Sequence, residues 1–542
     1  MRFPTLMIVS LIGVPLAFGG AHALGDRLAG VPSANPRASG VTLPTILSPG
    51  LAQVVSAQGS TQVENPSPQV RYYAYLNDQP NLMPALGSNV EASKTEPDKN
   101  TYLVLHDLKG ADPDYDYGSH FLFQGHEAGS PGKITRINLD ADAAHRVTVL
   151  ALTEKDGTTA LPTIDGSTWY PWAERLLFSQ EGNGSTTGGI WQATLDYPAA
   201  VESLAGVIGR GGYEGIQADP DGNIWIVEDI GGSTVAGARL PNSFLYRFIP
   251  KNRFDLTDGG RLQALQVKSK ATGLPIVFQT ASALTQDIKD LHTYGNVFST
   301  AWVTLHDTDA DGFAPFNANA LAKARGATPF KRPENGQFRP GTSFREFYFD
   351  ETGDTSATST AIPDHGGFGG VLKLVQSGPS ASTGRLTLFF KGDLEHAAFD
   401  NCAFWDEDRV VFVEDRGDGL HAQGNALDSG WLLDARADYS RPMSKPVRII
   451  AEGRDPSATI DSGLQGTPGF QNDGDNELTG IHVSDGDPTT HGLLGAKRPQ
   501  PFRDGWRVFY TAQHGDNVTW EIIRPAGTGH DDDDDDGDSG HH

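Results

Sequence analysis

Short apolar segments recur along the chain, and each ends at an acidic or amide residue that is followed by Gly, Asp or His. These end residues are Glu181, Glu228, Glu414 and Gln513, at separations of 47, 186 and 99 positions, which are close to one, four and two steps of a single unit. The segments are too short for helices and rich in β-branched and aromatic residues, so they indicate strands. They cover 175–180, 223–227, 409–413 and 507–512, with looser copies at 121–125 and 301–305.

A repeating unit of this length, built from short strands and turns, is typical of a β-propeller blade. We therefore predict an all-β protein, a six-bladed β-propeller that occupies 69–526 as one domain, with loop and helix insertions near 240–300 and 310–365. A β-sandwich with coincidental spacing is the alternative, and the acidic residue at the same strand end favours the propeller. Asp-Pro-Asp-Gly at 219–222 predicts a tight turn between two strands, and Asn317–Arg325 predicts a short helix.

The two ends of the chain have a different composition from this body. Residues 1–23 combine Arg2, an apolar stretch from Leu6 to Phe18 and a small-residue cleavage site, which predicts a signal peptide and a secreted or periplasmic protein. We predict that residues 24–68 form a linker with one early strand. Residues 527–542 are predicted to form a disordered Asp-rich tail.

Composition excludes several classes of function. The chain has 42 basic and 68 acidic side chains, a formal net charge of −26, which disfavours nucleic acid and anionic membranes as partners. The single cysteine, Cys402, excludes an internal disulfide and a Cys-rich zinc site, and we expect it to be a buried apolar residue. We expect no membrane insertion, and a monomer.

Several glutamates lie next to Gly or Pro in predicted turns. In a propeller, equivalent strand ends converge around the central channel, where unpaired carboxylates repel one another unless a cation neutralises them. Hard oxygen ligands without thiolates favour Ca²⁺ or Mg²⁺. The candidate metal ligands are Glu127, Glu181, Glu214, Glu334 and Glu477.

A second calcium candidate lies at Asp307, Asp309 and Asp311, followed by Gly312. Alternating aspartates before a glycine resemble the first half of a calcium loop. Position twelve is Ala318 rather than Glu, so the motif is not a complete EF-hand, and a polar turn is the alternative.

Four stretches together resemble the PhoX-type secreted alkaline phosphatases, a bacterial propeller family. Gly326 to Glu334 resembles the family element G-A-T-x-x-x-R-P-E, and Glu477-Leu-Thr-Gly480 with Val508 to Gly515 resembles its E-x-T-G and Q-H-P-G pair. The other two stretches are Asp165 to Glu181, and Phe399 to Asp415. Together the four span roughly 120–520.

The resemblance implies hydrolysis of a small phosphomonoester at a calcium-rich site in the channel, with metal ligands at Glu181, Glu214, Glu334 and Glu477. In the best-described members of the family the site also holds iron. Lys331 or Arg332 would then be the charge-assisted clamp on the phosphate oxygens.

The chain departs from the family pattern at several points. The metal-binding cysteine of the family falls near Asp165 here, which argues against Fe³⁺ and leaves Ca²⁺ as the expected cofactor. Only Glu181 stands where the family has a Glu-Glu pair, and no Arg-Arg pair precedes the apolar stretch. Two alternatives therefore stay open: a calcium-dependent propeller hydrolase of another kind, such as a lactonase or phytase-like esterase, and a non-catalytic propeller that calcium stabilises.

Overall fold

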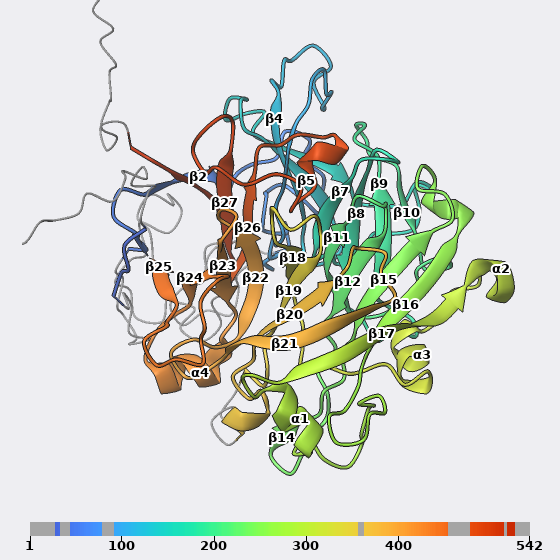
Figure 1. Ribbon diagram of the computed structural model, residues 1–542. Coiled ribbons are helices and arrows are strands. Elements are labelled where there is room, and N and C mark those ends of the chain that lie inside the picture. The colour runs from blue at the N-terminus through green and yellow to red at the C-terminus, as the bar shows by residue number, and fades with distance from the viewer. Residues whose placement is uncertain are drawn as a thin grey trace, which may run out of the picture.

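The computed structural model describes residues 28–32, 44–78, 92–355, 362–453, 477–513 and 517–525. Within these ranges the protein consists of strands with a few short helices (Figure 1). The predicted signal peptide and Asp-rich tail lie outside the described residues, as do parts of the predicted linker.

Most strands form antiparallel units of four, each built from consecutive segments of the chain. Two complete units of this kind follow one another in the first half of the chain. They are β3 (Thr101–Val104), β4 (His120–Gly125), β5 (Ile134–Asn138) and β6 (Val147–Ala151), then β7 (Ser167–Tyr170), β8 (Arg175–Gln180), β9 (Gly189–Ala193) and β10 (Val201–Ser203).

The middle of the chain forms one nine-stranded sheet that contains two such units. Strand β17 (Val297–Asp307) pairs with β16 on one side and β21 on the other, and so joins the units. The first unit is β11 (Tyr213–Ala218), β12 (Ile224–Glu228), β15 (Leu245–Pro250) and β16 (Gly260–Val267), and the second is β18 (Gly336–Phe338), β19 (Glu346–Glu351), β20 (Gly370–Gln376) and β21 (Thr383–Lys391).

The last two units recruit strands from the N-terminal part of the chain. Strand β1 (Ile46–Leu47) pairs with β25, and β2 (Ala52–Ala57) pairs with β28 as the outer strand of the last unit. These units are β22 (Phe399–Phe404), β23 (Arg409–Glu414), β24 (Ser429–Asp434) and β25 (Val447–Ala451), then β26 (Glu477–Ser484), β27 (Arg507–Gln513) and β28 (Val518–Ile523).

The first strands of the units contact one another in a closed ring: β3 with β7, β7 with β11, β11 with β18, β18 with β22, β22 with β26, and β26 with β3. This propeller-like arrangement of small sheets agrees with the all-β prediction. It also explains the repeat in the sequence, because the recurring segments that end at Glu181, Glu228, Glu414 and Gln513 are the second strands of four units.

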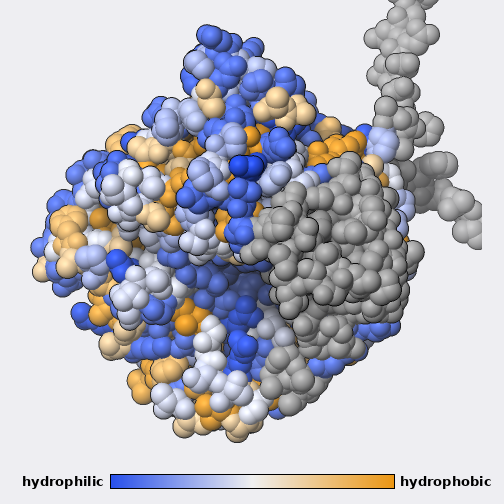
Figure 2. Space-filling view, turned by 180° about the vertical axis from the view of Figure 1, so that it is seen from behind, coloured by the Kyte–Doolittle hydropathy of each residue, from blue (hydrophilic) through white to orange (hydrophobic). Residues whose placement is uncertain are grey.

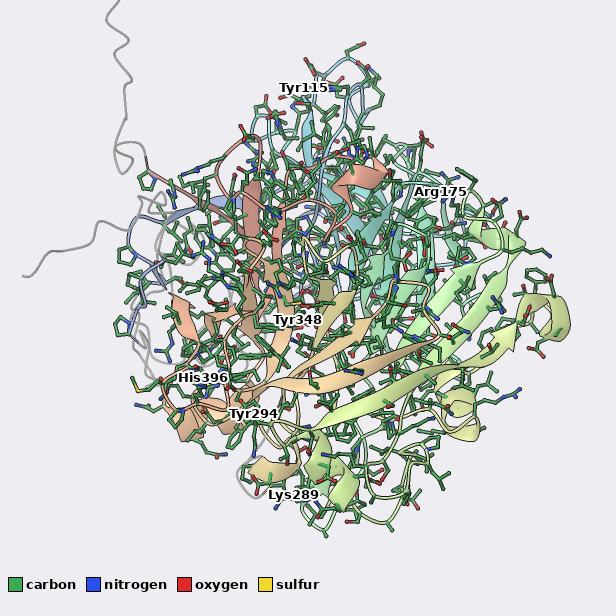
Figure 3. The ribbon with its side chains drawn as sticks, viewed as in Figure 1. Tyr115, Arg175, Lys289, Tyr294, Tyr348 and His396 are labelled. Atoms are coloured by element: carbon green, nitrogen blue, oxygen red, sulfur yellow. The ribbon has the colours of Figure 1, made fainter. Side chains whose placement is uncertain are left out.

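Apolar side chains fill the space between neighbouring units (Figure 3). Tyr348 of β19 packs edge-on against Phe404 of the next unit, with ring centroids 5.6 Å apart. Trp225 of β12 makes the same kind of contact with Phe338 of β18 at 5.0 Å. Because each face of a unit is covered by its neighbour, most strand residues are buried on both faces of the sheet, and the apolar segments show little polar alternation.

The helices of the described residues are short. Helix α3 (Ala318–Ala324) confirms the predicted helix, and its N-cap is Asn317, whose side chain accepts a hydrogen bond from the Ala320 N–H. No helix among these residues is long and apolar enough to span a membrane. The others are α1 (Gln286–Leu291), α2 (Thr308–Asp311), α4 (Gly417–Gly424) and the 3₁₀ turns η1 (Leu256–Asp258), η3 (Pro363–His365) and η4 (Thr490–Gly492); β13 (Thr234–Val235) and β14 (Ala238–Arg239) form a small hairpin.

Candidate metal centre

Acidic side chains gather at one end of the ring of first strands. In an antiparallel pair, the start of the first strand and the end of the second strand lie at the same edge. Carboxylates that precede a first strand and carboxylates that follow a second strand therefore meet. Asp98, Asp165 and Glu334 stand just before β3, β7 and β18, Glu214 and Asp400 lie near the starts of β11 and β22, and Glu181 and Asp229 follow β8 and β12.

These seven residues form what we call the carboxylate cluster. Their ligand atoms make three overlapping groups, and within each group all atoms lie within 4.8 Å of one another. The groups are Asp98, Asp165 and Glu214; Glu181, Glu214 and Asp229; and Glu214, Glu334 and Asp400. Glu214 belongs to all three and is therefore the centre of the cluster.

The local backbone turns these side chains toward the centre. The register of β11 against β12 shifts between Tyr213 and Ile216, so Glu214 and Gly215 form a bulge. The register of β22 against β23 shifts between Phe399 and Cys402, around Asp400. Bulges re-aim a side chain, and they are common next to functional sites.

Gly215 permits the close approach on which this geometry depends. Its N–H donates to the carbonyl oxygen of Glu334 at 2.8 Å, which ties β11 to the start of β18. A Cβ at position 215 would lie 2.6 Å from that oxygen, closer than real Cβ contacts come. Any side chain there would push apart two of the carboxylates.

Five of the seven cluster residues are buried, whereas Glu181 is exposed, and much of the negative charge of the cluster is uncompensated. Asp98, Asp165, Glu214, Glu334 and Asp400 are each no more than 5% exposed. Burial, followed by repulsion from Asp165 and Glu334, raises the pKa of Glu214 well above its usual value. Burial and then Asp98 do the same for the pKa of Asp165 and of Asp400. In the absence of a cation, the fold thus favours protonated carboxyls at this position.

Among the described residues, Arg332 is the cation that pairs directly with members of the cluster. Its Nε donates to Asp229 at 2.8 Å, and its Nη2 lies 2.7 Å from Asp229 and 2.8 Å from Glu334. The Arg332 backbone is in the left-handed region, at φ 54°, so the residue is held in a conformation that its side chain does not favour. The guanidinium is thereby placed beside two of the candidate metal ligands.

The structure gives the other predicted clamp residue a different contact. Lys331 is 2% exposed, and its Nζ donates to Asp354 at 2.8 Å rather than to a member of the cluster. Its N–H donates to Glu351 at 2.7 Å. These bonds anchor the backbone next to Arg332, so Lys331 supports the neighbouring residue and does not face the carboxylates.

Glu477 and Glu127 lie at the edge of the cluster. Burial and then Asp415, Asp400 and Asp98 raise the pKa of Glu477, which opens β26. Burial and then Glu477 and Asp98 raise the pKa of Glu127. Both residues are thus close to the cluster electrostatically, but neither belongs to its three groups of ligand atoms.

Asp307, Asp309 and Asp311 are far from a calcium-loop arrangement. Asp307 is the N-cap of α2, where its carboxylate accepts from the Asp309 N–H. The Asp311 carboxylate accepts from the Asp307 N–H, and Asp309 pairs with Lys251 at 2.6 Å. The three carboxylates form no metal-compatible group among the described residues. The weaker alternative, a polar turn, describes this segment.

Several residues of the cluster were not predicted from the sequence as candidate metal ligands. Asp98, Asp229 and Asp400 were missed, and Asp165 was noted only as the place of the family cysteine. The doublets Glu228-Asp229 and Glu414-Asp415 explain part of this. Glu228 is inside β12, fully buried, and accepts from Tyr246 Oη at 2.7 Å, whereas the Asp that follows it reaches the cluster. In β12 the residue that reaches the cluster is therefore Asp229, which follows the strand, and not Glu228, which ends it.

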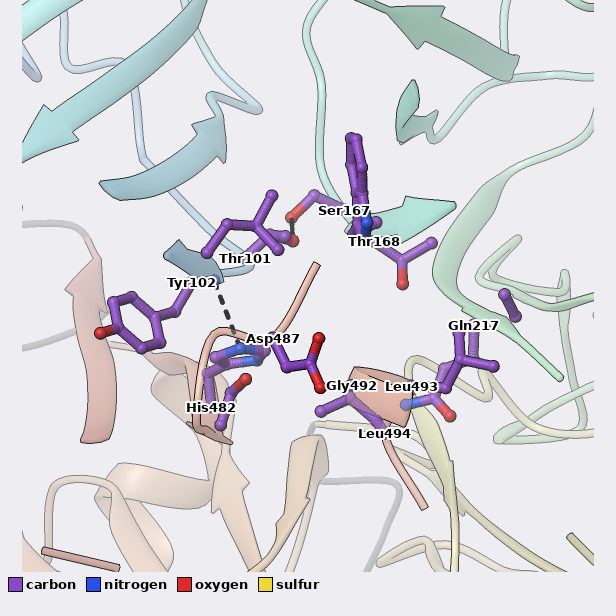
Figure 4. A pocket seen from close by; sticks show the side chains of 14 residues that line it. Thr101, Tyr102, Ser167, Thr168, Gln217, His482, Asp487, Gly492, Leu493 and Leu494 are labelled. Atoms are coloured by element: carbon purple, nitrogen blue, oxygen red, sulfur yellow. Dashed lines mark hydrogen bonds between the residues drawn. The ribbon is translucent and has the colours of Figure 1, made fainter. Parts of the chain in front are cut away.

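A small cavity lies among the first strands of four units, β3, β7, β11 and β26 (Figure 4). Its lining includes Tyr102, Ser167, Gln217 and His482, which follow the acidic residues on their strands. The cavity holds about 30 Å³, room for a water molecule or two but not for a phosphate ester. From behind, the molecule has a hollow lined by strongly hydrophilic residues (Figure 2).

The donor set of the cluster fits hard cations. Buried carboxylates at this spacing repel one another strongly unless positive charge lies between them, and carboxylate oxygens are the ligands that Ca²⁺ and Mg²⁺ prefer. The chain offers no thiolate to this site, because Cys402 is buried within β22 and burial raises the pKa of its thiol well above the usual value. The residues present would therefore hold calcium or a similarly hard ion.

The model of the family "Alkaline phosphatase PhoX" matches residues 236–437, which include Arg332, Glu334 and Asp400. A solved structure, "Pseudomonas fluorescens PhoX in complex with vanadate, a transition state analogue", aligns with 92% of this chain and 98% of its own, at 11% identity and a TM-score of 0.53. Residues 236–437 of the chain are thus similar to the PhoX alkaline phosphatases, and the whole chain shares the fold of a PhoX structure. The family is one of phosphomonoesterases, and at this identity the solved PhoX structure shows that the fold is shared.

Two further comparisons add little to the PhoX match. The PQQ-bound aldose sugar dehydrogenase from Streptomyces coelicolor aligns with 79% of this chain and 100% of its own at 13% identity, but its TM-score of 0.29 is too low to indicate a shared fold. No curated protein matches the chain.

Proposed function

We propose that the chain is a metal-dependent phosphomonoesterase whose carboxylate cluster holds calcium. The observation that carries the proposal is the convergence of seven carboxylates and one arginine at one end of the ring, in a chain similar to the PhoX alkaline phosphatases. Without bound cations so acidic a site would repel a phosphate dianion, so the substrate itself requires them.

Bound cations would neutralise the phosphate charge, polarise the phosphorus centre and lower the pKa of a water molecule. Residues of the cluster would hold them, with Glu214 shared between positions. Arg332 would orient the phosphate through charge-assisted hydrogen bonds, since a guanidinium matches two phosphate oxygens at once. Its present partners, Asp229 and Glu334, would keep it in place when no substrate is bound.

The metal identity follows from the same donor set. An all-carboxylate site, with the place of the family cysteine falling near Asp165, supports Ca²⁺ and offers Fe³⁺ no thiolate. Elemental analysis of the purified protein separates the alternatives. Calcium without iron would support the proposal, and stoichiometric iron would contradict this part of it.

The decisive experiment is hydrolysis of p-nitrophenyl phosphate by the mature protein, with calcium and then with excess chelator. We expect turnover that the chelator abolishes and that calcium restores. Absence of chelator-sensitive turnover from pH 7 to 10 would refute the phosphatase proposal. Activity confined to lactones or inositol phosphates would favour another hydrolase, and a calcium-dependent rise in melting temperature without turnover would favour a non-catalytic propeller.

Two further proposals concern architecture and location. We propose that the six four-stranded units are the six blades of one propeller, which β2 closes as the outer strand of the last blade. We also propose secretion or export to the periplasm, from the composition of residues 1–23. N-terminal sequencing of the exported protein would test the latter by locating the cleavage after residue 23.

A further inference from the structure

A second buried cation lies beside the carboxylate cluster, and it differs from Arg332 in its partners. Lys99 follows Asp98 at the start of the first unit and is only 4% exposed. Its Nζ donates to the amide oxygens of Asn401 at 2.8 Å and Asn335 at 3.2 Å. No described carboxylate lies within ion-pair distance of it. The ammonium charge is therefore held by neutral groups and is not cancelled by a direct partner.

The amides that hold Lys99 also hold the cluster. Asn401 Nδ2 donates to Asp400 Oδ1 at 2.8 Å and to Thr479 Oγ1 at 2.9 Å. Thr479 Oγ1 in turn donates to Asp98. The network thus joins Lys99 to two carboxylates of the cluster and ties together residues from three units.

Asn335 extends the network to a further unit. Its Nδ2 donates to Asn401 Oδ1 at 3.1 Å, and its N–H donates to Asp350 Oδ1 at 2.7 Å. Asp350 also accepts from the Glu334 N–H at 3.1 Å, which fixes the backbone of that candidate ligand. With every partner anchored in this way, Lys99 has little freedom to withdraw from the site.

The charge of Lys99 acts on two buried carboxyl groups, those of Asp400 and Asp350. Burial raises the pKa of Asp400 and of Asp350, and Lys99 acts in the opposite direction on both. The ammonium charge of Lys99 therefore offsets part of the negative charge of the cluster.

We propose that Lys99 acts as a built-in cation: its fixed charge, which Asn401 and Thr479 hold beside Asp98 and Asp400, weakens the binding of divalent cations to the cluster. This inference rests on the proposed binding of calcium. Among the residues that the structure describes, the cationic side chains beside the seven carboxylates are Arg332, which pairs with two of them, and Lys99, which is held by amides. Removal of one of those two charges makes the cluster more negative and should strengthen its attraction for Ca²⁺.

The test is calorimetric titration of calcium into chelator-treated full-length protein, wild type against Lys99→Met. The variant should bind Ca²⁺ about 10-fold more tightly, which corresponds to roughly 1.4 kcal/mol. A purely structural role predicts the opposite sign, because a distorted cluster binds cations more weakly. Equal or weaker binding by Lys99→Met would overturn the inference.

Two further variants complete the test, one as a control and one as a substitute for Lys99→Met. Lys133→Met is the matched control, because Lys133 is also a buried lysine, 1% exposed, but its Nζ lies near the carbonyl oxygen of Tyr72 at 3.4 Å and not in this network. Its calcium affinity should equal that of the wild type. Lys99→Gln keeps an N–H donor and removes only the charge, and it serves if Lys99→Met does not fold. If the wild type binds no calcium, the proposed function fails, and with it the basis of this inference.

Discussion

Substitution of Glu214 by Gln is the most informative perturbation of the carboxylate cluster. The side chain is 5% exposed and contributes to all three groups of ligand atoms, and Gln preserves its size while removing its charge. An ion equidistant from three oxygens at the limiting spacing of 4.8 Å lies within about 2.8 Å of each, close to calcium–oxygen distances. One substitution therefore alters every cation position that the cluster offers.

We expect the substitution to weaken calcium binding and to stabilise the metal-free protein. At about 3 Å and an effective dielectric constant of about 20, one unit charge contributes roughly 5 kcal/mol per unit of ion charge. Recovered hydration offsets most of this, and we expect a net loss of about 3 kcal/mol, or ~100-fold in calcium affinity. Without metal, the variant should be more stable than the wild type at pH 8, because a buried, repelled carboxylate has been removed.

Differential scanning calorimetry in excess chelator and in saturating calcium measures both effects. Glu214→Gln should melt at least about 2 °C higher than the wild type in chelator, and should gain much less from calcium. Glu228→Gln is the matched control in the same unit: Glu228 is buried but bonded to Tyr246 and Asn319, so its calcium response should equal that of the wild type. A Glu214→Gln variant that melts lower in chelator yet keeps the full calcium response would refute the reasoning.

Three further expectations follow from the same geometry. Arg332→Met should raise KM for p-nitrophenyl phosphate by about 10- to 100-fold and weaken inhibition by inorganic phosphate, whereas Arg339→Met, which removes pairs with Glu346 and Asp408, should leave KM unchanged in steady-state assays. The raised pKa values of the buried cluster carboxyls favour the protonated fold, so in chelator the melting temperature should fall as pH rises from 5 to 8, while the gain from calcium should grow; a pH-independent calcium gain would contradict this. Asp309→Asn should leave calcium affinity unchanged in titrations, because Asp309 pairs with an exposed lysine; weaker binding would restore the calcium loop as a site.

The repeat and the identity of several cluster residues could be read directly from the chain. A strand in this fold is short, apolar and followed by a turn, and each of these is a local property that adjacent residues encode. The same local logic predicted a short helix over 317–325, which the structure has at 318–324 with Asn317 as its N-cap. Glu181, Glu214 and Glu334 stood out because each is next to Gly or Pro, where a first strand begins or a second strand ends.

Local pattern did not show which partner a charged side chain takes. Lys331 and Arg332 are neighbours with the same charge, yet one pairs with Asp354 and the other with Asp229. The Asp307 motif looked like half of a calcium loop, but its carboxylates accept hydrogen bonds from their own backbone. In neither case does the residue type reveal which way the side chain points.

The sequence by itself determined the all-β architecture, its repeat and the family resemblance, because short-range patterning sets strands and turns. Only the tertiary structure decided which carboxylates meet. Asp98 and Asp400 are 302 positions apart, and they join one cluster because the ring of first strands closes and brings every strand start to the same end of the molecule. Lys99 became visible for the same reason, since its charge is held by amides from two other units.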